Sequence, residues 1–315
     1  DAMYQVLAYY IFTEITDPHK EVKNHKQFFK DRDVSGRIYI SEEGINGQMS
    51  GSLEEAKSYM EWLRSDLRFA RVKFKIDESS ENIFPRMSVK YREQLVALDE
   101  KASAQEGGEH VPPAKWKEML ESGEYLVLDV RNDYESAIGH FKGAITPPLK
   151  TFREFPEYAQ KLSEEVDPEK TKVMMYCTGG IRCELYSALL KKRGFQDVYQ
   201  LDGGVIQYGL EEGSAHWEGK LFVFDDRLAI PIDGKEAVPI SSCSFCEASS
   251  DTYYNCANMD CNTLFLACPS CVEEERGCCC ESCKEVPRLR PFDPKAGNKP
   301  FRKKHLLMQE CGCGG

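Results

Sequence analysis

Cysteine is scarce in most of this 315-residue chain. The first 240 residues contain two cysteines, whereas the remaining residues contain twelve. Long apolar runs are absent, because none approaches the roughly 20 residues that a helix needs to span a bilayer. No signal-peptide pattern precedes the first apolar stretch. We therefore expect a cytoplasmic protein without a membrane partner, whose cysteines serve catalysis or metal binding in preference to disulfides. No motif indicates a protein partner.

Positive charge is also in short supply, since 41 Lys and Arg stand against 52 Asp and Glu and leave a net charge of −11. This balance argues against nucleic-acid binding through bulk electrostatics and leaves only local basic patches to consider. The chain has no dinucleotide-binding fingerprint, so no organic cofactor is indicated.

A ligand set for non-haem iron is not evident either. The nearest grouping is His19, Glu21 and His25 in the first expected helix. His19 and His25 are six residues apart and do not share a helix face, so the sequence does not favour iron there.

Residues 1–98 carry the strand and helix patterns of a small α+β domain. The stretch "YQVLAYYIF" indicates a buried strand, and residues 18–30 and 53–65 indicate amphipathic helices. Residues 36–52 indicate two strands around a Gly/Asn turn, and "RVKFKI" (71–76) a half-buried strand. The order β-α-β-β-α-β predicts a ferredoxin-like sandwich.

The rest of the chain divides into a linker, an α/β domain and a cysteine-rich tail. Residues 99–113 are polar and rich in Gly and Pro, as expected of a linker. Residues 114–240 alternate strands with helices, which predicts a parallel sheet covered on both faces, followed by a hairpin over an Asp-Asp turn. Residues 241–315 form the cysteine-rich tail with a basic arm.

The most informative short stretch is "MMYCTGGIRCELYS", residues 174–187. Cys177 follows a buried strand and precedes a helix, which places it at the carboxyl edge of the sheet, where open α/β sheets keep their active sites. The loop glycines can aim backbone N–H groups inward, and the helix N-terminus and a guanidinium favour thiolate over thiol. We therefore predict Cys177 and Arg182 as catalytic residues. The predicted active-site loop is completed by Thr178, Gly179, Gly180 and Ile181.

Both cysteines of this stretch have a competing interpretation. A free cysteine is usually a small buried hydrophobic residue, although the Gly-Gly-x-Arg context argues against that for Cys177. Cys183 lies in the first turn of the expected helix. It either resolves a persulfide or sulfenate on Cys177 or is packed and inert, and the sequence leaves both open.

The tail carries cysteines at metal-ligand spacing. Paired thiolates two to four residues apart are the usual way to build tetrahedral zinc sites. Few large apolar residues separate the pairs, so a metal would replace a hydrophobic core. We predict two structural zinc sites, with one ligand from the Cys278–Cys280 run, and keep a disulfide knot and an iron–sulfur cluster as alternatives. The predicted ligands are Cys243, Cys246, Cys256, Cys261, Cys268, Cys271, Cys279 and Cys283.

Residues 287–305 form a basic arm with seven Lys and Arg against a single Asp. Its prolines exclude one long helix, so we expect an extended segment. Interleaved Phe side chains can stack on bases while the cations meet phosphates. The alternative is a solvated basic tail that balances an acidic body. The predicted nucleic-acid contacts are Arg288, Arg290, Arg302, Lys303 and Lys304.

The loop resembles that of the rhodanese superfamily, in which a catalytic Cys and an Arg are separated by four residues, as in Cys177-Thr-Gly-Gly-Ile-Arg182. Related dual-specificity phosphatases have one more residue there, to enclose a phosphate, so the shorter loop favours sulfur chemistry. The stretch "LDVRNDYESAIGHFKGA" matches the family's early motif, and "LDGG" at 201–204 is a second supporting mark. The matching residues of the early motif are Asp129, Arg131, Glu135 and His140, and we expect His140 to be structural.

A closer resemblance covers nearly the whole chain. The stretches "SGRIYISEEGINGQMSG", "IFPRMSVKYREQLVALD", "FREFPEY", "MMYCTGGIRCE" and "LDGGVIQYG", with the cysteine-rich tail, occur in this order. Together they resemble the bacterial rhodanese-type tRNA uridine hydroxylases. The resemblance implies an oxidoreductase that installs a 5-hydroxyl on the wobble uridine (position 34) of tRNA, with molecular oxygen as co-substrate and Cys177 as the functional cysteine.

Two other hypotheses stay open beside this one. The first is a sulfurtransferase that carries a persulfide on Cys177. The second is a binding module, in which a redundant rhodanese fold presents a zinc-type RNA-binding tail; the intact Cys-x4-Arg loop speaks against it.

Overall fold

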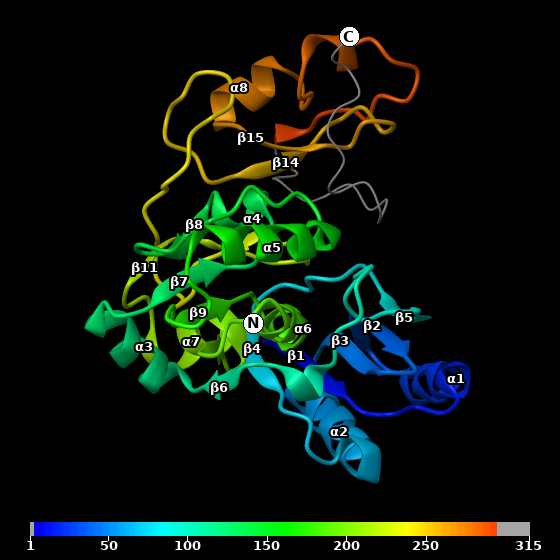
Figure 1. Ribbon diagram of the computed structural model, residues 1–315. Coiled ribbons are helices and arrows are strands. Elements are labelled where there is room, and N and C mark those ends of the chain that lie inside the picture. The colour runs from blue at the N-terminus through cyan, green and yellow to red at the C-terminus, as the bar shows by residue number, and fades with distance from the viewer. Residues whose placement is uncertain (1–2, 295–315) are drawn as a thin grey trace. The chain divides into compact units, whose positions relative to one another are not determined.

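The computed structural model describes residues 3–294, which form two compact units (Figure 1). The first unit consists of Asp1–Val130 and Phe152–Gly213, and the second of Arg131–Thr151 and Ser214–Gly315, each as far as it is described. Within these residues no helix is both long and apolar enough to cross a membrane.

The N-terminal part of the first unit is a five-stranded sheet of order β4-β1-β3-β2-β5. Its first four strands have the ferredoxin-like order, which confirms the predicted fold class, and β5 adds a strand parallel to β2. The elements are β1 (Tyr4–Phe12), α1 (Pro18–Phe29), β2 (Val34–Ser41), β3 (Gly44–Gly51), α2 (Leu53–Arg64), the 3₁₀ turn η1 (Leu67–Phe69), β4 (Lys75–Ser79) and β5 (Met87–Tyr91).

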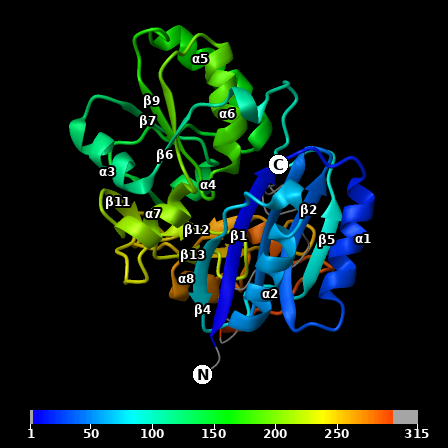
Figure 2. The ribbon, with the colours of Figure 1, turned by 90° about the horizontal axis from the view of Figure 1, so that it is seen from below.

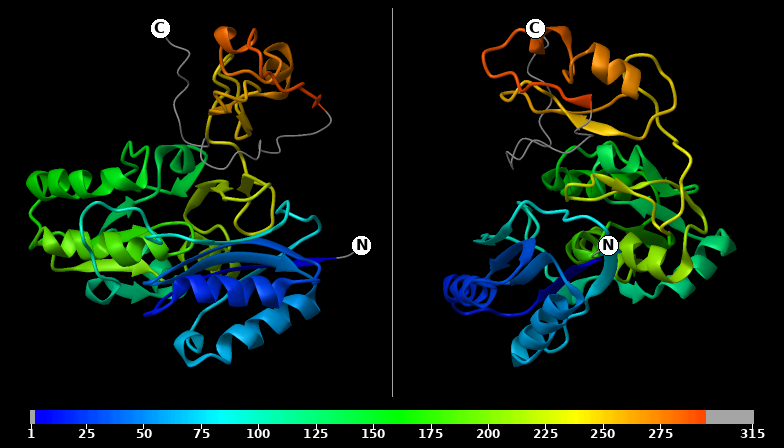
Figure 3. Two further views of the ribbon diagram at one scale, coloured as in Figure 1. Left: turned by 90° about the vertical axis from the view of Figure 1, so that its right-hand side faces the viewer. Right: turned by 180° about the vertical axis from the view of Figure 1, so that it is seen from behind.

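Both helices of this part begin at side-chain caps and cover the same face of the sheet (Figure 3, left, blue and light blue). The Asp17 side chain accepts from the Lys20 N–H at 3.1 Å, and Ser52 accepts from the Glu55 N–H at 3.1 Å. Alternate residues of β1, such as Tyr9, enter the core beneath the helices. The residues between them, such as Tyr10, face the opposite side of the sheet.

Three expectations for this region need correction. The β2–β3 turn lies at residues 42–43, and the Gly/Asn stretch belongs to β3. A Cβ atom at Gly47 would lie 2.5 Å from Tyr9 Oη, so that glycine permits close packing where we expected a turn. The expected strand 71–76 begins only at Lys75, because Val72 still donates its N–H to the Phe69 carbonyl of the preceding turn. The expected linker contains a strand, β6 (Glu109–Val111).

The second part of the first unit is a parallel sheet, as predicted, and its strand order is β6-β10-β9-β7. In Figure 2, α5 and α6 lie on one side of this sheet and α3 and α7 on the other. The elements are η2 (Ala104–Glu106), β6 (Glu109–Val111), α3 (Pro113–Ser122), β7 (Leu126–Asp129), η3 (Phe152–Glu154), α5 (Phe155–Glu165), β9 (Val173–Tyr176), α6 (Ile181–Lys192), β10 (Val198–Leu201) and α7 (Gly204–Glu212).

The second unit is built from short elements around two small cores. One core gathers Ile138, Phe222, Leu228 and Tyr253, and the other consists mainly of cysteines. The predicted hairpin over the Asp-Asp turn is present as β12 and β13. The elements are α4 (Asp133–Ser136), β8 (Gly139–Phe141), β11 (Trp217–Gly219), β12 (Leu221–Phe222), β13 (Ala229–Ile230), β14 (Tyr253–Asn255), β15 (Leu264–Leu266), α8 (Pro269–Glu274) and η4 (Glu281–Cys283).

Candidate active site

The backbone of the Cys177 loop is fixed by the start of α7. The carbonyl of Cys177 accepts from the Val205 N–H, and that of Thr178 from the Ile206 N–H, both at 3.1 Å. Gly204 lies against these carbonyls with a φ of +64°, and a Cβ atom there would lie 2.4 Å from the Thr178 oxygen. The loop therefore depends on a glycine outside the predicted loop itself, in the "LDGG" stretch at 201–204.

Cys177 is fully buried, and its sulfur is surrounded by donors and positive charge. The Gly180 N–H donates to Sγ at 3.1 Å. Burial alone would raise the pKa of Cys177. The Cys183 thiol and backbone N–H, the Arg182 charge and the Gly180 N–H outweigh it and lower the pKa from 9.0 to about 6. The group is therefore mainly a thiolate at neutral pH, which is the nucleophilic form.

The remaining loop residues form the surroundings of the Cys177 sulfur. Arg182 is 5% exposed, donates to Thr178 Oγ1 at 3.3 Å, and lies 4.9 Å from the Phe152 ring centroid. Gly180 precedes α6 with a φ of +105°, a conformation that glycine adopts most easily. Gly179 and Ile181 are partly exposed beside it.

Cys183 is buried and forms a hydrogen bond with Cys177. Burial raises its own pKa well above 9.0, and the neighbouring Cys177 raises it further. Cys183 therefore stays protonated and donates its S–H to the thiolate. This contact keeps both interpretations of Cys183 open, because a donor to Cys177 is also within reach of chemistry on it.

A hydrogen-bonded group from three elements adjoins the loop, and sequence reasoning missed it. Glu184, in the first turn of α6, accepts from Tyr10 Oη at 2.8 Å and lies 2.6 Å from His110 Nε2. The hydrogen bond to Glu184 raises the pKa of His110. A Cβ atom at Gly180 would lie 3.0 Å from Tyr10 Oη, so β1 closes directly over the loop. No local pattern could have indicated Tyr10, since it meets the loop only through folding.

A cavity of about 750 Å³ opens beside the loop within the same unit. Its walls combine aromatic rings with cations and carboxylates, and Gly203, one of the lining residues, borders the loop at Gly180. Lys75 is 6% exposed, and its Nζ lies 5.1 Å from the Tyr10 ring centroid. The lining residues used below are Tyr10, Phe12, Arg71, Lys73, Phe74, Lys75 and Glu184.

The early-motif residues all have structural partners. Tyr176 Oη donates to Asp129 at 2.8 Å, and Arg131 donates to the Gly139 carbonyl at 2.7 Å. Glu135 caps α4 by accepting from the Asn132 N–H at 2.9 Å. His140 Nδ1 lies 2.9 Å from the Ser136 carbonyl, in keeping with the structural role expected for it.

The eight predicted metal ligands gather into two sets of four, which interleave along the chain. The first set is Cys243, Cys246, Cys268 and Cys271, and the second is Cys256, Cys261, Cys279 and Cys283. Within each set all sulfur atoms lie within 4.8 Å of one another. Cys278 and Cys280 belong to neither set.

The spacing of these thiols fits a single tetrahedral ion in each set. A Zn–S bond of about 2.3 Å implies sulfur atoms about 3.8 Å apart. The Cys246–Cys268 and Cys261–Cys279 sulfur distances are 3.7 Å, and Cys279–Cys283 is 4.0 Å. None of the cysteines in residues 3–294 is joined in a disulfide. Either set could hold a metal.

The basic arm is described only in part. Arg288 pairs with Asp260 at 2.7 Å, and Arg290 donates to the Asn255 carbonyl at 3.0 Å. Both contacts lie within the second unit, and neither tests the predicted role in RNA binding. Arg302, Lys303 and Lys304 lie outside the described residues.

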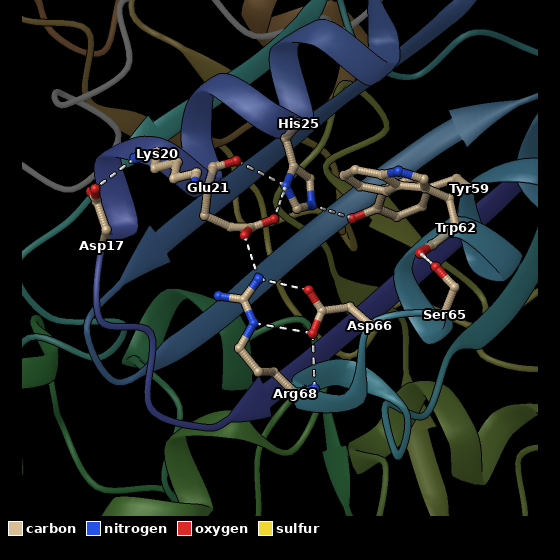
Figure 4. Close-up of polar contacts among 9 residues, drawn as sticks. All are labelled: Asp17, Lys20, Glu21, His25, Tyr59, Trp62, Ser65, Asp66 and Arg68. Carbon is tan, nitrogen blue, oxygen red and sulfur yellow. Dashed lines mark hydrogen bonds and ion pairs between the residues drawn. The ribbon is translucent and has the colours of Figure 1, made fainter.

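The three residues weighed as iron ligands have other partners. Glu21 lies between His25 Nδ1, at 3.2 Å, and the Arg68 guanidinium, at 2.7 Å (Figure 4). His25 Nε2 lies 3.1 Å from Tyr59 Oη, whereas the His19 ring packs against Tyr91. Among residues 3–294, the groupings suited to a metal are the two cysteine sets. The contacts of Glu21 with His25 and Arg68, and of His25 with Tyr59, join α1 to η1 and α2.

Comparison with known families matches the chain in three parts. The UPF0176 acylphosphatase like domain matches residues 4–95, the Rhodanese-like domain residues 112–210, and the family described as Rhodanase C-terminal residues 218–284. These assignments agree with the order of the folds described above.

Curated relatives match over nearly the full length. The tRNA uridine(34) hydroxylase of Protochlamydia amoebophila is 60% identical over 306 residues, which cover 97% of this chain and 96% of that protein. The tRNA uridine(34) hydroxylase of Chlamydia trachomatis serovar D is 58% identical over 313 residues, with coverage of 98% and 96%. Among solved structures, a rhodanese-like domain from Anabaena sp. matches 35% of this chain and 78% of its own, with 23% identity and a TM-score of 0.30.

Proposed function

Because the chain belongs to the family of tRNA uridine(34) hydroxylases, we propose that it hydroxylates the wobble uridine of tRNA at C5. The observation that carries the proposal is the buried Cys177 thiol, whose pKa is lowered to about 6 beside Arg182 and the Gly180 N–H. A nucleophile of this kind suits the uracil ring, where C6 is electrophilic because it is conjugated to the C4 carbonyl.

In the first step the Cys177 thiolate adds to C6. A bond forms between Sγ and C6, and the C5=C6 electron pair moves toward C4 so that negative charge collects on O4 and C5. No group leaves. The buried surroundings exclude water and strengthen every charge interaction in the site.

In the second step C5 receives an oxygen atom. One atom of O₂ enters C5 and the other leaves as water, which requires two electrons and two protons from an external donor, such as two thiols that are oxidised to one disulfide. C5 then loses its proton and the Sγ–C6 bond breaks, which restores the double bond and the thiolate. Arg182 and the loop N–H groups stabilise the negative charge that returns to Sγ when the Sγ–C6 bond breaks. A persulfide on Cys177 is the alternative reactive form, held by the same groups.

The cavity beside the loop has the lining expected for an unstacked nucleotide. Tyr10, Phe12 and Phe74 offer rings on which a base can stack, while Arg71 and Lys73 can meet phosphates. Further phosphate contacts would come from the basic arm, through Arg288, Arg290, Arg302, Lys303 and Lys304. A substrate of this kind is found in the cytoplasm, where we propose that the enzyme acts.

We assign zinc to the two cysteine sets. Four thiolates at tetrahedral spacing suit Zn²⁺, and a site closed by four protein ligands is structural in character. The ions would hold the second unit folded and take no part in the chemistry at Cys177.

The test uses purified protein, tRNA that lacks the modification, a thiol reductant and ¹⁸O₂, with nucleosides read by mass spectrometry. We expect labelled 5-hydroxyuridine from the wild type and none under nitrogen. Cys177→Ser should give no product while keeping its circular dichroism spectrum and zinc content. Hydroxylation by Cys177→Ser would remove Cys177 from the mechanism.

The same experiment addresses sulfur transfer, which the names of the relatives do not favour. A sulfurtransferase would deliver sulfur from thiosulfate to cyanide, or add sulfur to the nucleoside, and would incorporate no label from ¹⁸O₂. That pattern would replace the proposal by the alternative.

A further inference from the structure

Lys75 is a buried cation whose role the reaction above does not explain. It is the first residue of β4 and pairs with Ala8 of β1, so the acylphosphatase-like domain fixes its backbone. Its side chain runs along the α/β part of the unit. A Cβ atom at Gly203 would lie 3.8 Å from its Cδ, and one at Gly179 would lie 3.9 Å from its Nζ. The ammonium group therefore lies next to Gly179 of the Cys177 loop.

The titratable groups that face Lys75 come from four parts of the first unit. Tyr10 lies on β1, Cys177 in the loop after β9, Glu184 on α6 and Asp202 after β10. Burial lowers the pKa of Lys75 to about 8, and attraction to Cys177, Asp202 and Glu184 limits the fall. Lys75 is thus still mainly charged at neutral pH, and Cys177 is the neighbour that favours its charge most.

No partner within residues 3–294 accepts a hydrogen bond from this ammonium group or forms an ion pair with it. Glu184 is instead engaged with Tyr10 and His110, and Asp202 with Lys73 at 3.4 Å. A buried ammonium group carries three N–H donors that are costly to leave unused. Since Lys75 lines the cavity, those donors are available to a ligand that enters beside Cys177.

We propose that Lys75 is a catalytic residue, which donates a hydrogen bond to O4 of the uracil ring as the Cys177 thiolate adds to C6. This inference rests on the proposed function. In the free enzyme the ammonium group stabilises the thiolate. As the sulfur charge passes into the ring it stabilises the enolate oxygen, so a positive charge faces the negative charge throughout the addition. No proton needs to be transferred in this step.

The test compares Lys75→Met and Lys75→Arg with the wild type and with Lys57→Met, which removes an exposed lysine from α2 of the same domain. The first readout is the pH midpoint of Cys177 alkylation by iodoacetamide. Trypsin cuts after Lys172 and Arg182, so Cys177 and Cys183 lie on separate peptides that mass spectrometry can follow individually. The second readout is kcat and KM for tRNA hydroxylation.

For Lys75→Met we expect the Cys177 midpoint to rise by roughly one pH unit, because a positive neighbour that favours the thiolate is removed. We expect kcat to fall on the order of 10²-fold, as when one stabiliser of developing charge is removed, with little change in KM. Lys75→Arg should keep the midpoint low and recover part of kcat, and Lys57→Met should match the wild type.

Two results would overturn the inference: a fall in kcat with an unchanged midpoint, or a raised midpoint with unchanged kcat. Failure of Lys75→Arg to recover any activity beyond Lys75→Met would also reject a role based on charge. If the wild type makes no 5-hydroxyuridine, the proposed function fails and the O4 contact fails with it. The alkylation midpoint still decides whether Lys75 and Cys177 form a charge pair.

Discussion

At the scale of single residues, Gly204 shows how the Cys177 loop depends on a position outside the loop itself. It begins α7 with a φ of +64° and lies against the carbonyls of Thr178 and Cys177. Gly123, which ends α3, has a similar φ of +69°, but a Cβ atom there would meet nothing within 4 Å. Both glycines have a positive φ, but of the two only Gly204 has neighbours that a Cβ atom would meet.

Substituting alanine at each of these two glycines separates the cost of backbone strain from the cost of a steric clash. Gly123→Ala should lower the free energy of unfolding by about 1 kcal/mol, the cost of a left-handed conformation for alanine, without changing activity. Gly204→Ala should lower it further and reduce hydroxylation, because its methyl group displaces the loop carbonyls. Urea unfolding and the nucleoside assay measure both effects. Equal losses of stability in the two variants would show that the loop tolerates the extra methyl group.

The sequence predicted the residues of the Cys177 loop but not its surroundings. Cys177, Arg182 and the loop glycines lie within six residues, and their spacing alone favours an anion cradle. Tyr10 and Lys75 come from strands more than 100 positions away along the chain. Period-two alternation shows that Tyr9 and Tyr10 face opposite sides of β1, but not which part of the chain covers the second side.

At the scale of elements, helices were predicted more closely than strands. The helices α1 and α2 are capped by Asp17 and Ser52, whose capping bonds are local and therefore visible in sequence. Strands are fixed by partners that the sequence does not reveal. β6 is the example: three residues of a polar segment that we expected to be a linker pair with β10 at the edge of the parallel sheet.

The cysteine sets make a prediction about metal content. We expect two zinc ions per chain, one of which is absent from Cys279→Ser, whereas Cys280→Ser, one position along and outside both sets, keeps two. Because the ions replace a hydrophobic core, a chelator should unfold residues 243–283 and leave the parallel sheet folded. Elemental analysis and hydrogen exchange measure these outcomes. Iron with inorganic sulfide in the wild type, or a lower zinc content in Cys280→Ser, would contradict the assignment.

At the scale of the whole molecule, the net charge of −11 sets a constraint on RNA binding. An acidic body repels a polyanion at long range, so affinity for tRNA must come from local groups such as the basic arm. Contacts of this kind release counterions and make binding depend on salt.

Replacing Arg302, Lys303 and Lys304 with Ala should therefore weaken tRNA binding and flatten its salt dependence, by nearly one unit of log–log slope for each phosphate that the arm no longer neutralises. Replacing Lys20, Lys23 and Lys26 on α1, which are exposed, gives the same change in net charge and should leave the slope unchanged. Binding measured from low to high salt tests both triple variants. If both alter the slope equally, overall charge governs binding and the arm has no specific role.

The interleaving of the two cysteine sets also limits how this region can evolve. Metal-binding modules arranged in tandem can be duplicated, deleted or exchanged one at a time, since a recombination point between them leaves both intact. Here the second set begins at Cys256, before the first is completed at Cys271. Any break between residues 243 and 283 leaves at most one set of four cysteines whole. The region is therefore inherited as one indivisible piece, which can change by substitution but cannot be divided and recombined.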